Sequence, residues 1–381
     1  MKTLKDLSLK GKHVLMRVDF NVPSIADDSR IRAALPSINY VLGQGAALIL
    51  MSHLGRPKGK DPKLTLAPCA KRLSELLGKP VLFAPDCVGP VAEKMASELK
   101  PGQVLLLENL RFHVGEEEPE KEPDFVANLA KLGDVYVNDA FGTAHRAHAS
   151  TAFIAKEFKN RAAGFLMEKE IAVLSELIHE PKRPFYAIIG GAKVSTKIGL
   201  IQNLLKRVDA LFLGGGMTFT FMKANGLEIG DSLFEADHVK EAKEVLKSPK
   251  LHLPLDIVIA DKFSNEAHRK LISGSIPVGW QGLDIGPKTI HEWSTAFSKA
   301  ATVFWNGPLG VFEMSNFANG TKKIAEALAD SKAKVIVGGG DSVAAIEQMG
   351  LADKFYHLST GGGASLEFLE YGHLPGIAAL D

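Results

Sequence analysis

The sequence predicts an α/β protein with two doubly wound, Rossmann-like parallel-sheet domains joined by a helix. Short apolar, β-branched runs recur along the whole chain, and each ends abruptly in glycine or a polar residue. Runs of roughly four to eight such residues, bounded by turn residues, are typical of strands buried on both faces. Because longer amphipathic stretches alternate with these runs, we expect parallel sheets covered by helices. A length of 381 residues favours two domains.

The strand-like runs follow one another in both halves of the chain. The first half contains HVLMRVDFN, AALILMSHLG, QVLLLENLRF and DVYVNDAFG. The second half contains FYAIIGGAK, ALFLGGGM, DIVIADKF, TVFWNGPLG, KVIVGGGDS and KFYHLSTGGG. Between two of them, TLAPCAKRLSELLG places Leu66, Ala70, Leu73 and Leu77 on one helical face. Gly78 follows as a helix stop.

A connecting helix is expected near the middle of the chain. In MEKEIAVLSELIHEPKRP, apolar residues repeat at helical spacing from Ile171 to Ile178. Pro181 and Pro184 then precede a new strand that begins at Phe185. This pattern predicts a helix that connects an N-terminal and a C-terminal domain.

Composition excludes several classes of protein. Lys and Arg total 45 against 44 for Asp and Glu, a formal net charge of +1, which argues against a polybasic nucleic-acid or membrane-surface protein. The longest apolar run, from Ala46 to Met51, is far shorter than the ~20 residues that span a bilayer. No signal-peptide pattern opens the sequence. Cys69 and Cys87 form neither a CxxC motif nor a disulfide framework. We therefore expect a cytoplasmic protein without nucleic-acid or membrane partners.

Four glycine-rich turns follow predicted strands of the second half and precede predicted helices. They are Gly190–Gly191, Gly214–Gly216, Gly338–Gly340 and Gly361–Gly363. In open α/β sheets, ligands bind beyond the carboxyl ends of the strands, where glycine lets backbone N–H groups approach a phosphate. Glycine also serves tight turns for steric reasons alone. Four such turns at equivalent strand ends favour phosphate binding.

The second half carries phosphate-binding side chains without a standard nucleotide motif. No GxxxxGK[ST], no GxGxxG after the first strand and no HRD…DFG set occurs. In GGAKVSTK, Lys193 and Lys197 are spaced for one helical face, where two ammonium groups can meet a phosphate chain. In GGGDS, Asp341 is suited to Mg²⁺ and Ser342 to phosphate. Glu313 is suited to accept from a ribose hydroxyl.

The first half carries a set of side chains suited to a small anionic substrate. Several follow strand ends and should converge on one edge of the sheet, where Arg and His can grip a phosphate or carboxylate. The set comprises Asp19, Asn21, Arg30, His53, Arg56, Arg111, His145, Arg146 and His148. The HxxH spacing of His145 and His148 lacks a third ligand, so metal binding there is not expected. The acidic stretch from Glu116 to Asp124 is expected to be a solvated loop and helix start.

Nine of these blocks together resemble phosphoglycerate kinase. RVDFNVP, SHLGRP, ENLRF, NDAFGTAHRAHAS, GGAKVSTKI, GGGMTFTF, WNGPLGVFE, GGGDS and STGGGASLEFLE occur in that family's order, between about residues 13 and 378. The resemblance implies a glycolytic phosphotransferase with a carboxyl group as acceptor. It would transfer the acyl phosphate of 1,3-bisphosphoglycerate reversibly to MgADP, giving 3-phosphoglycerate and MgATP.

The resemblance also implies a division of the chain. Residues 1–165 would bind 3-phosphoglycerate, residues 166–182 would form a hinge helix, residues 183–362 would bind the nucleotide, and residues 363–381 would return to the first domain. It implies substrate binding by Asp19, Phe20, Asn21, Arg30, His53, Leu54, Gly55, Arg56, Arg111 and Arg146. It implies nucleotide binding by Lys197, Gly214, Gly215, Pro308, Glu313, Gly339, Gly340, Asp341 and Ser342, with Mg²⁺ on Asp341. Arg30, Lys193, Lys197, Gly340 and Gly362 would act on the transferring phosphate.

The implied reaction needs no general base, because the carboxylate of the glycerate is already ionised at neutral pH. Alignment, charge neutralisation and exclusion of water by domain closure would then carry catalysis. Two other readings fit less well. A nicotinamide-dependent oxidoreductase requires the missing GxGxxG motif. A non-catalytic sugar-phosphate binding module has no use for Lys193, Lys197, Asp341 and Ser342. We expect a monomer with small-molecule substrates only.

Overall fold

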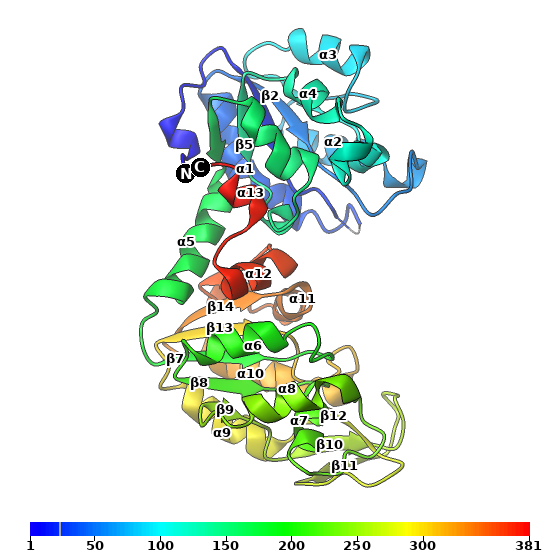
Figure 1. Cartoon of the computed structure of the whole chain (residues 1–381), viewed down its shortest axis with the longest axis vertical. Helices are drawn as coiled ribbons and strands as arrows, with labels where there is room; N and C mark the ends of the chain where they lie inside the picture. The colour runs from blue at the N-terminus through cyan, green and yellow to red at the C-terminus, as the bar shows by residue number, and fades with distance from the viewer. Residues whose placement is uncertain (23) are drawn as a thin grey trace. The chain divides into compact units, whose positions relative to one another are not determined.

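The computed structural model describes residues 1–22 and 24–381. Its contacts divide the chain into two compact units (Figure 1), residues 1–172 with 373–381, and residues 173–372. Each unit is built on a parallel sheet of six strands, so the expected fold class is confirmed. In the residues described, no helix is long and apolar enough to cross a membrane.

The first unit is a sheet with strand order β3-β4-β2-β1-β5-β6. Its strands are β1 (His13–Arg17), β2 (Ala47–Met51), β3 (Val81–Phe83), β4 (Val104–Leu106), β5 (Val135–Asn138) and β6 (Arg161–Ala163). Its helices are α1 (Ser29–Gly43), α2 (Ala67–Leu77), α3 (Pro90–Ser97), α4 (Phe125–Ala130) and α13 (Pro375–Ala378). The chain leaves β1 for β2 on one side and later returns to β5 on the other. Ligands of such sheets bind where the strand order reverses in this way.

Helix α2 shows how the apolar pattern forms the core of this unit. Leu66, Ala70 and Leu73 are buried in the cluster that covers the sheet, and Leu77 packs against it. Gly78 ends the helix in the left-handed conformation, with φ of 63°, which a glycine adopts without the strain that a Cβ would add. The expected helix and its stop are therefore confirmed.

The second unit contains a parallel sheet with order β15-β14-β13-β7-β8-β9 and a smaller sheet with order β11-β10-β12. The parallel strands are β7 (Phe185–Ile189), β8 (Ala210–Leu213), β9 (Leu251–His252), β13 (Thr302–Asn306), β14 (Lys334–Gly338) and β15 (His357–Leu358). The smaller sheet has β10 (Ile257–Ala260), β11 (Arg269–Ile272) and β12 (Gln281–Ile285). The helices are α6 (Ile198–Leu205), α7 (Thr218–Ala224), α8 (Val239–Val245), α9 (Pro287–Phe297), α10 (Asn319–Ala329), α11 (Gly340–Gln348) and α12 (Gly363–Tyr371).

One strand expected in a parallel sheet belongs elsewhere. The run DIVIADKF forms β10, which pairs antiparallel with both β11 and β12. A tight connection closes the β10–β11 hairpin, because Asp261 N donates to His268 O at 3.2 Å and His268 N donates to Asp261 Oδ1 at 3.0 Å. Only antiparallel neighbours can be joined by so short a turn. An apolar run has the same pattern in either kind of sheet, so the sequence did not distinguish them.

Helix α5 (Phe165–His179) runs across the division between the units. At its start, Asp139 Oδ1 accepts from Leu166 N at 2.9 Å and Met167 N at 3.2 Å within the first unit. Further along, Glu176 pairs with Lys334 within the second unit. The two ends of the helix are therefore attached to different units.

The chain rejoins the first unit later than the sequence implied. Helix α12 belongs to the second unit, and the returning segment begins at His373 rather than at residue 363. In that segment Gly376 N donates to Ala144 O at 2.8 Å. The two termini lie side by side in Figure 1, and the N-terminal ammonium pairs with Asp381 Oδ1 at 2.9 Å.

Candidate active site

Three strand-end segments of the first unit meet at one turn. Asn21, which follows β1, accepts through Oδ1 from Gly55 N at 2.9 Å. Arg111, which follows β4, donates from Nη1 to Gly55 O at 2.7 Å. Gly55 has φ of 63°, and a Cβ there would lie 2.9 Å from the Leu64 side chain. The structure thus brings Asn21, Gly55 and Arg111 together at the carboxyl edge of the sheet.

Arg30 reaches this edge from helix α1. Its Nη1 donates to Asp19 Oδ2 at 3.0 Å, while 37% of its side chain stays exposed. The guanidinium has five N–H donors in a planar fork. Asp19 therefore orients the group through one contact and leaves most of the fork available to a bound anion.

Arg111 retains an unused donor inside the protein. Its Nη2 lies 3.0 Å from Glu117 Oε1, and its Nε is buried without a hydrogen-bond partner among the described residues. Burial lowers the pKa of Arg111, and Glu117 opposes that shift. A buried donor left unpaired costs roughly 1–3 kcal/mol. An anionic oxygen that occupied this place would remove the cost.

His53 is held as a neutral imidazole. Burial, followed by repulsion from Arg17, Arg111 and Arg30, lowers its pKa well below the usual value. Its Nδ1 lies 3.2 Å from Arg17 Nη2. Because a guanidinium can only donate, Nδ1 must be the acceptor, and the ring proton is carried by Nε2.

The remaining predicted residues of this half occupy different environments. Arg56 and Arg146 are exposed; repulsion from Arg56 contributes to the lowered pKa of Arg111, and repulsion from Arg146 to that of His148. Leu54 N donates to Asn109 Oδ1 at 3.2 Å. Phe20 is completely buried in the core, and its backbone N–H donates to Ser52 Oγ at 2.8 Å, so this residue supports the site from within the protein.

A buried polar network beneath the site was missed by sequence reasoning. Arg17 Nε donates to Ser150 Oγ at 2.8 Å, and Ser150 donates in turn to Glu116 Oε1 at 2.6 Å. Tyr136 donates its hydroxyl to Ser150 O at 2.8 Å. One signal was available, since Arg17 is flanked on both sides by apolar residues in the stretch VLMRV.

Glu116 corrects the expectation of a solvated acidic stretch. Its side chain is fully buried, accepts from Ser150 N at 3.0 Å, and lies 4.0 Å from Arg17 Nη2. Burial raises the pKa of Glu116, and Arg17 opposes that rise. The next residue, Glu117, pairs with Arg111. The start of the acidic stretch is therefore part of the basic site and neutralises it locally.

In the second unit, the glycine turns after β7, β8 and β13 pack backbone against backbone. Gly190 N donates to Asn306 O at 2.7 Å, and Gly191 N donates to Pro308 O at 2.9 Å. A Cβ on Gly215 would lie 2.6 Å from Gly191 N, and a Cβ on Gly190 would lie 2.1 Å from Pro308 O. Any larger residue at Gly190 or Gly215 would collide with neighbouring backbone, so the turns can pack this closely only with glycine. They lie where the strand order of the sheet reverses.

Gly340 and Gly362, in the turns that begin α11 and α12, are less crowded. In the part of the chain that the structure describes, no atom would lie within 4 Å of a Cβ on Gly340 or Gly362. Each glycine lies at the N-terminus of its helix, where backbone N–H groups lack intrahelical partners and attract anions. Gly339 has φ of 94°, and a Cβ there would lie 2.4 Å from Asn306 Nδ2.

Lys197 is partly buried among the packed turns and donates from Nζ to Gly190 O at 2.5 Å. Burial lowers the pKa of Lys197 to about 8, and the negative charge of Asp341 opposes that shift. Lys193 is exposed and lies in the loop before α6, which begins at Ile198. The expectation that the two lysines share a helical face is therefore wrong.

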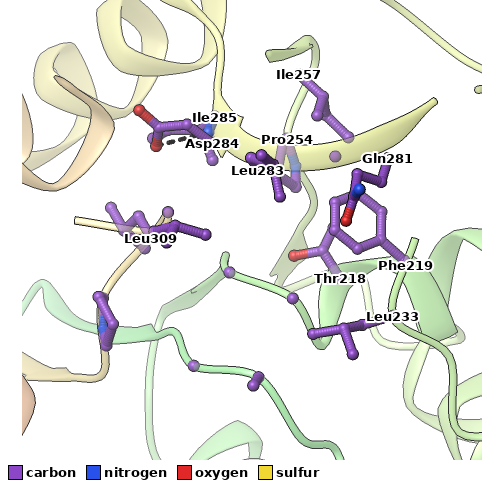
Figure 2. A pocket seen from close by; sticks show the side chains of 18 of the residues that line it. Thr218, Phe219, Leu233, Pro254, Ile257, Gln281, Leu283, Asp284, Ile285 and Leu309 are labelled. Carbon is purple, nitrogen blue, oxygen red and sulfur yellow. Dashed lines mark hydrogen bonds between the residues drawn. The ribbon is translucent and has the colours of Figure 1, made fainter. Parts of the chain in front are cut away.

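A cavity of about 450 Å³ opens beside these turns. Four predicted residues line it, Gly215, Pro308, Glu313 and Asp341. Figure 2 shows the apolar side chains of Phe219, Leu233, Leu283 and Leu309 around the same space. Sequence reasoning missed this apolar lining, because its residues come from separate segments that only the fold brings together.

The cavity wall also contains two buried polar side chains, Thr218 and Asp284. The hydroxyl of Thr218 is buried without a partner among the described residues. Asp284 accepts from Gly320 N at 2.8 Å and Ile285 N at 2.9 Å, the latter bond drawn in Figure 2. Burial raises the pKa of Asp284 to about 7.

Ser342 and Asp341 begin helix α11 and have different surroundings. Ser342 is buried, and its Oγ accepts from Gly307 N at 2.6 Å. Asp341 is exposed at the cavity. Gly214, Lys197, Gly339, Gly340 and Ser342 are not among the residues that line the cavity, so they lie at its border or beyond it.

The two units thus combine a basic anion site with an apolar cavity bordered by glycine turns, an arrangement typical of a phosphotransferase. The model of the protein family described as phosphoglycerate kinase matches residues 4–372 of this chain. Phosphoglycerate kinase 3, cytosolic, of Arabidopsis thaliana is 54% identical over 100% of this chain and 98% of its own length. The Moorella thermoacetica phosphoglycerate kinase is 56% identical over 99% of this chain and 98% of its own.

Solved structures agree with this assignment. The phosphoglycerate kinase structure from Coxiella burnetii superposes with a TM-score of 0.89 at 40% identity and covers 99% of this chain and 98% of its own. The structure from Pyrococcus horikoshii gives a TM-score of 0.88 at 35% identity, with coverage of 100% and 98%. The chain belongs to the phosphoglycerate kinase family. It is therefore an enzyme that transfers a phosphoryl group reversibly between 1,3-bisphosphoglycerate and ADP in glycolysis.

Proposed function

We propose that the anion site of the first unit holds the phosphoglycerate. The observation that carries this proposal is the meeting of Asn21, Gly55 and Arg111 at one turn, with an unpaired Nε of Arg111 buried beside it. Arg30 offers further donors, and neutral His53 offers its Nε2–H. Exposed Arg56 and Arg146 add positive charge. Phosphate and carboxylate oxygens are the acceptors that such donors bind best.

The cavity of the second unit is proposed to hold the adenosine of ADP or ATP. Its apolar walls suit a purine ring, and Glu313 at the same cavity suits a ribose hydroxyl. The phosphates would extend toward Lys197 and the open N-termini at Gly340 and Gly362. Lys193, exposed in the neighbouring loop, can add a second ammonium group.

Asp341 fits the Mg²⁺ that this family's nucleotide substrates typically carry. Its carboxylate is exposed at the cavity, and carboxylate oxygen is a ligand that Mg²⁺ prefers. When bound, the metal neutralises charge on the nucleotide phosphates. Lys197 and the helix N-termini would hold the phosphate chain in line with the glycerate carboxylate.

Transfer is proposed to need no general base, since the attacking carboxylate carries no proton at neutral pH. Arg30, Lys197 and the N–H groups at Gly340 and Gly362 would neutralise charge on the transferring phosphoryl group. The two substrates would bind to different units, so the units must close to react and to exclude water. Helix α5 is the proposed hinge, because its two ends are attached to different units.

The enzyme is proposed to act as a cytoplasmic monomer on small molecules, without nucleic-acid or membrane partners. Relatives from Arabidopsis thaliana and Triticum aestivum carry the word cytosolic in their names. A spectrophotometric assay tests the site proposal. Turnover of 3-phosphoglycerate, coupled to a reductase that consumes the product, should require both ATP and Mg²⁺ and should fall when Arg111 is replaced by Ala. Full activity without Mg²⁺, or in the variant, would contradict it.

A further inference from the structure

A cluster of metal-ligating atoms is formed by residues outside the proposed substrate site. Asp86 and Cys87 follow the edge strand β3, and His113 follows the helical turn Leu110–Phe112. One oxygen, one sulfur and one nitrogen atom from these three side chains all lie within 4.8 Å of one another. Nothing in the proposed phosphoryl transfer uses this cluster.

His113 is fixed between two carboxylates. Its Nε2 lies 2.6 Å from Asp86 Oδ1, and its Nδ1 lies 3.0 Å from Glu122 Oε1. The ring also stacks on Phe125 with a centroid distance of 5.2 Å. Metal-binding histidines are typically oriented in this way, by a carboxylate on the nitrogen that faces away from the ion. Nε2, which is bonded to Asp86 before any ion binds, is therefore the ligand atom.

Glu122 is itself held in position. Its Oε2 accepts from Gly115 N at 3.0 Å, which leaves Oε1 for the imidazole. A Cβ on Gly115 would lie 2.7 Å from Glu122 Cβ, so this close approach requires glycine. Glu122 therefore orients the imidazole of His113 without a bound ion.

Cys87 contributes the third atom. It is completely buried and forms no disulfide, and burial, with the charge of Asp86, holds the pKa of its thiol well above the usual value. The second cysteine, Cys69, is also buried, but among the described residues it belongs to no such cluster of ligand atoms; its Sγ lies 3.9 Å from Phe20 O, and burial together with the charge of Glu108 raises its pKa to about 11. Cys69 is therefore a matched control.

We propose that Asp86, Cys87 and His113 bind one Zn²⁺ ion, with water in the fourth position and Glu122 as the positioning residue of His113. Zn²⁺ binds O, N and S atoms at about 2.0–2.3 Å in a tetrahedron, which separates ligand atoms by about 3.3–3.8 Å. The sulfur needs to move inward slightly, and the bond between Asp86 and His113 needs to open. On binding, the Cys87 thiol and the Nε2–H of His113 each release a proton to solvent, and Nδ1 keeps the proton that it donates to Glu122.

The mixed ligand set also selects against other ions. Mg²⁺ prefers oxygen ligands in an octahedral arrangement, whereas thiolate and imidazole suit zinc. Lys60 Nζ lies 3.0 Å from Asp86 Oδ2; it is 65% exposed and can swing into solvent when the ion neutralises the carboxylate. The site is therefore expected to fill with Zn²⁺ even in excess Mg²⁺.

Titration of the full chain with Co²⁺ in excess Mg²⁺ tests the proposal, because tetrahedral Co²⁺ replaces Zn²⁺ and absorbs visibly. We expect one equivalent per chain, a near-ultraviolet thiolate-to-cobalt band, and loss of that band when Zn²⁺ is added. Cys87→Ser should lose the band, while Cys69→Ser should keep it. No band in the unaltered protein, or a band that survives in Cys87→Ser, would overturn the proposal.

Two further variants keep the thiol in place, in case serine at the buried position prevents folding. Glu122→Gln should keep the thiolate band but bind Co²⁺ roughly 10–100-fold more weakly, the usual effect of losing an outer partner. His113→Gln should weaken binding at least as much. An unchanged affinity in His113→Gln would show that the imidazole is not a ligand and would overturn the assignment.

Discussion

Arg17 Nη2 lies 3.2 Å from Nδ1 of His53, so a buried arginine in β1 and a histidine after β2 share one hydrogen bond. This contact selects the tautomer of His53 and, together with burial, keeps the ring neutral. The positive charge of Arg17 is matched by fully buried Glu116, 4.0 Å away. A basic site is thus built over an internal ion pair, which limits the repulsion among its arginines.

Arg30→Ala should collapse kcat, by about 100-fold or more, while the affinity for ATP stays nearly unchanged. Asp19 orients the guanidinium in the first unit, where we propose that it stabilises charge in the transition state. Steady-state kinetics and nucleotide titration measure the two effects separately. Arg32→Ala serves as the control, since that arginine lies on the same helix but pairs with Asp28, the residue before the helix begins. Unchanged turnover in Arg30→Ala would refute its role.

Arg111→Ala should mainly raise the KM for 3-phosphoglycerate, because it removes two kinds of donor. One is the Nη1 that contacts Gly55 O, and the other is the buried Nε that has no partner among the described residues. Arg111→Lys should recover little, since an ammonium group lacks the planar fork. Initial-rate measurements with each substrate varied in turn provide the comparison. An effect confined to the KM for ATP would contradict binding of the phosphoglycerate by the first unit.

The kcat/KM for ATP should fall as pH rises through about 8. Lys197 has its pKa lowered to about 8 by burial, so the ammonium that we place on the phosphates is lost above that pH. The kcat/KM profile reports the ionisation of the free enzyme. In Lys197→Arg the decline should vanish, because a guanidinium stays charged. If kcat/KM for ATP declines at the same pH in Lys197→Arg, the ionisation responsible belongs to a group other than Lys197.

Asp139→Asn should change how stability depends on pH. Burial raises the pKa of Asp139 to about 7 from an unfolded value of 3.8, so the folded state binds the proton more tightly between these values. Its contribution to stability is therefore present in acid and is lost as pH rises toward 7. Between pH 5 and pH 8, the unfolding free energy of the wild type should decrease by roughly 2–3 kcal/mol relative to Asp139→Asn.

Urea denaturation of both proteins at several pH values measures this difference. Asparagine keeps the oxygen that accepts from Leu166 N and Met167 N at the start of α5, so these two hydrogen bonds are preserved. Parallel stability curves for the two proteins would show that Asp139 does not titrate as argued.

Much of the fold and site could be predicted from local pattern. Alternation of apolar runs with amphipathic stretches is a local property, and it indicated two parallel sheets, the helix α2 and its stop at Gly78. Placing polar residues after the strands also predicted that Asn21 and Arg111 would share an edge, because the carboxyl ends of parallel strands lie together; both contact Gly55. The nine motif blocks sufficed to identify the family.

The tertiary structure alone decided which of these groups are buried and what they contact. Glu116 looks like part of a solvated acidic run, yet Arg17 and Ser150 draw it into the protein. The apolar run of β10 joins an antiparallel sheet, and Lys193 lies in a loop although its spacing suited a helix. Burial, ion pairing and strand direction depend on partners distant along the chain. A local sequence pattern carries the residue types for such contacts, and only the folded chain determines which of them meet.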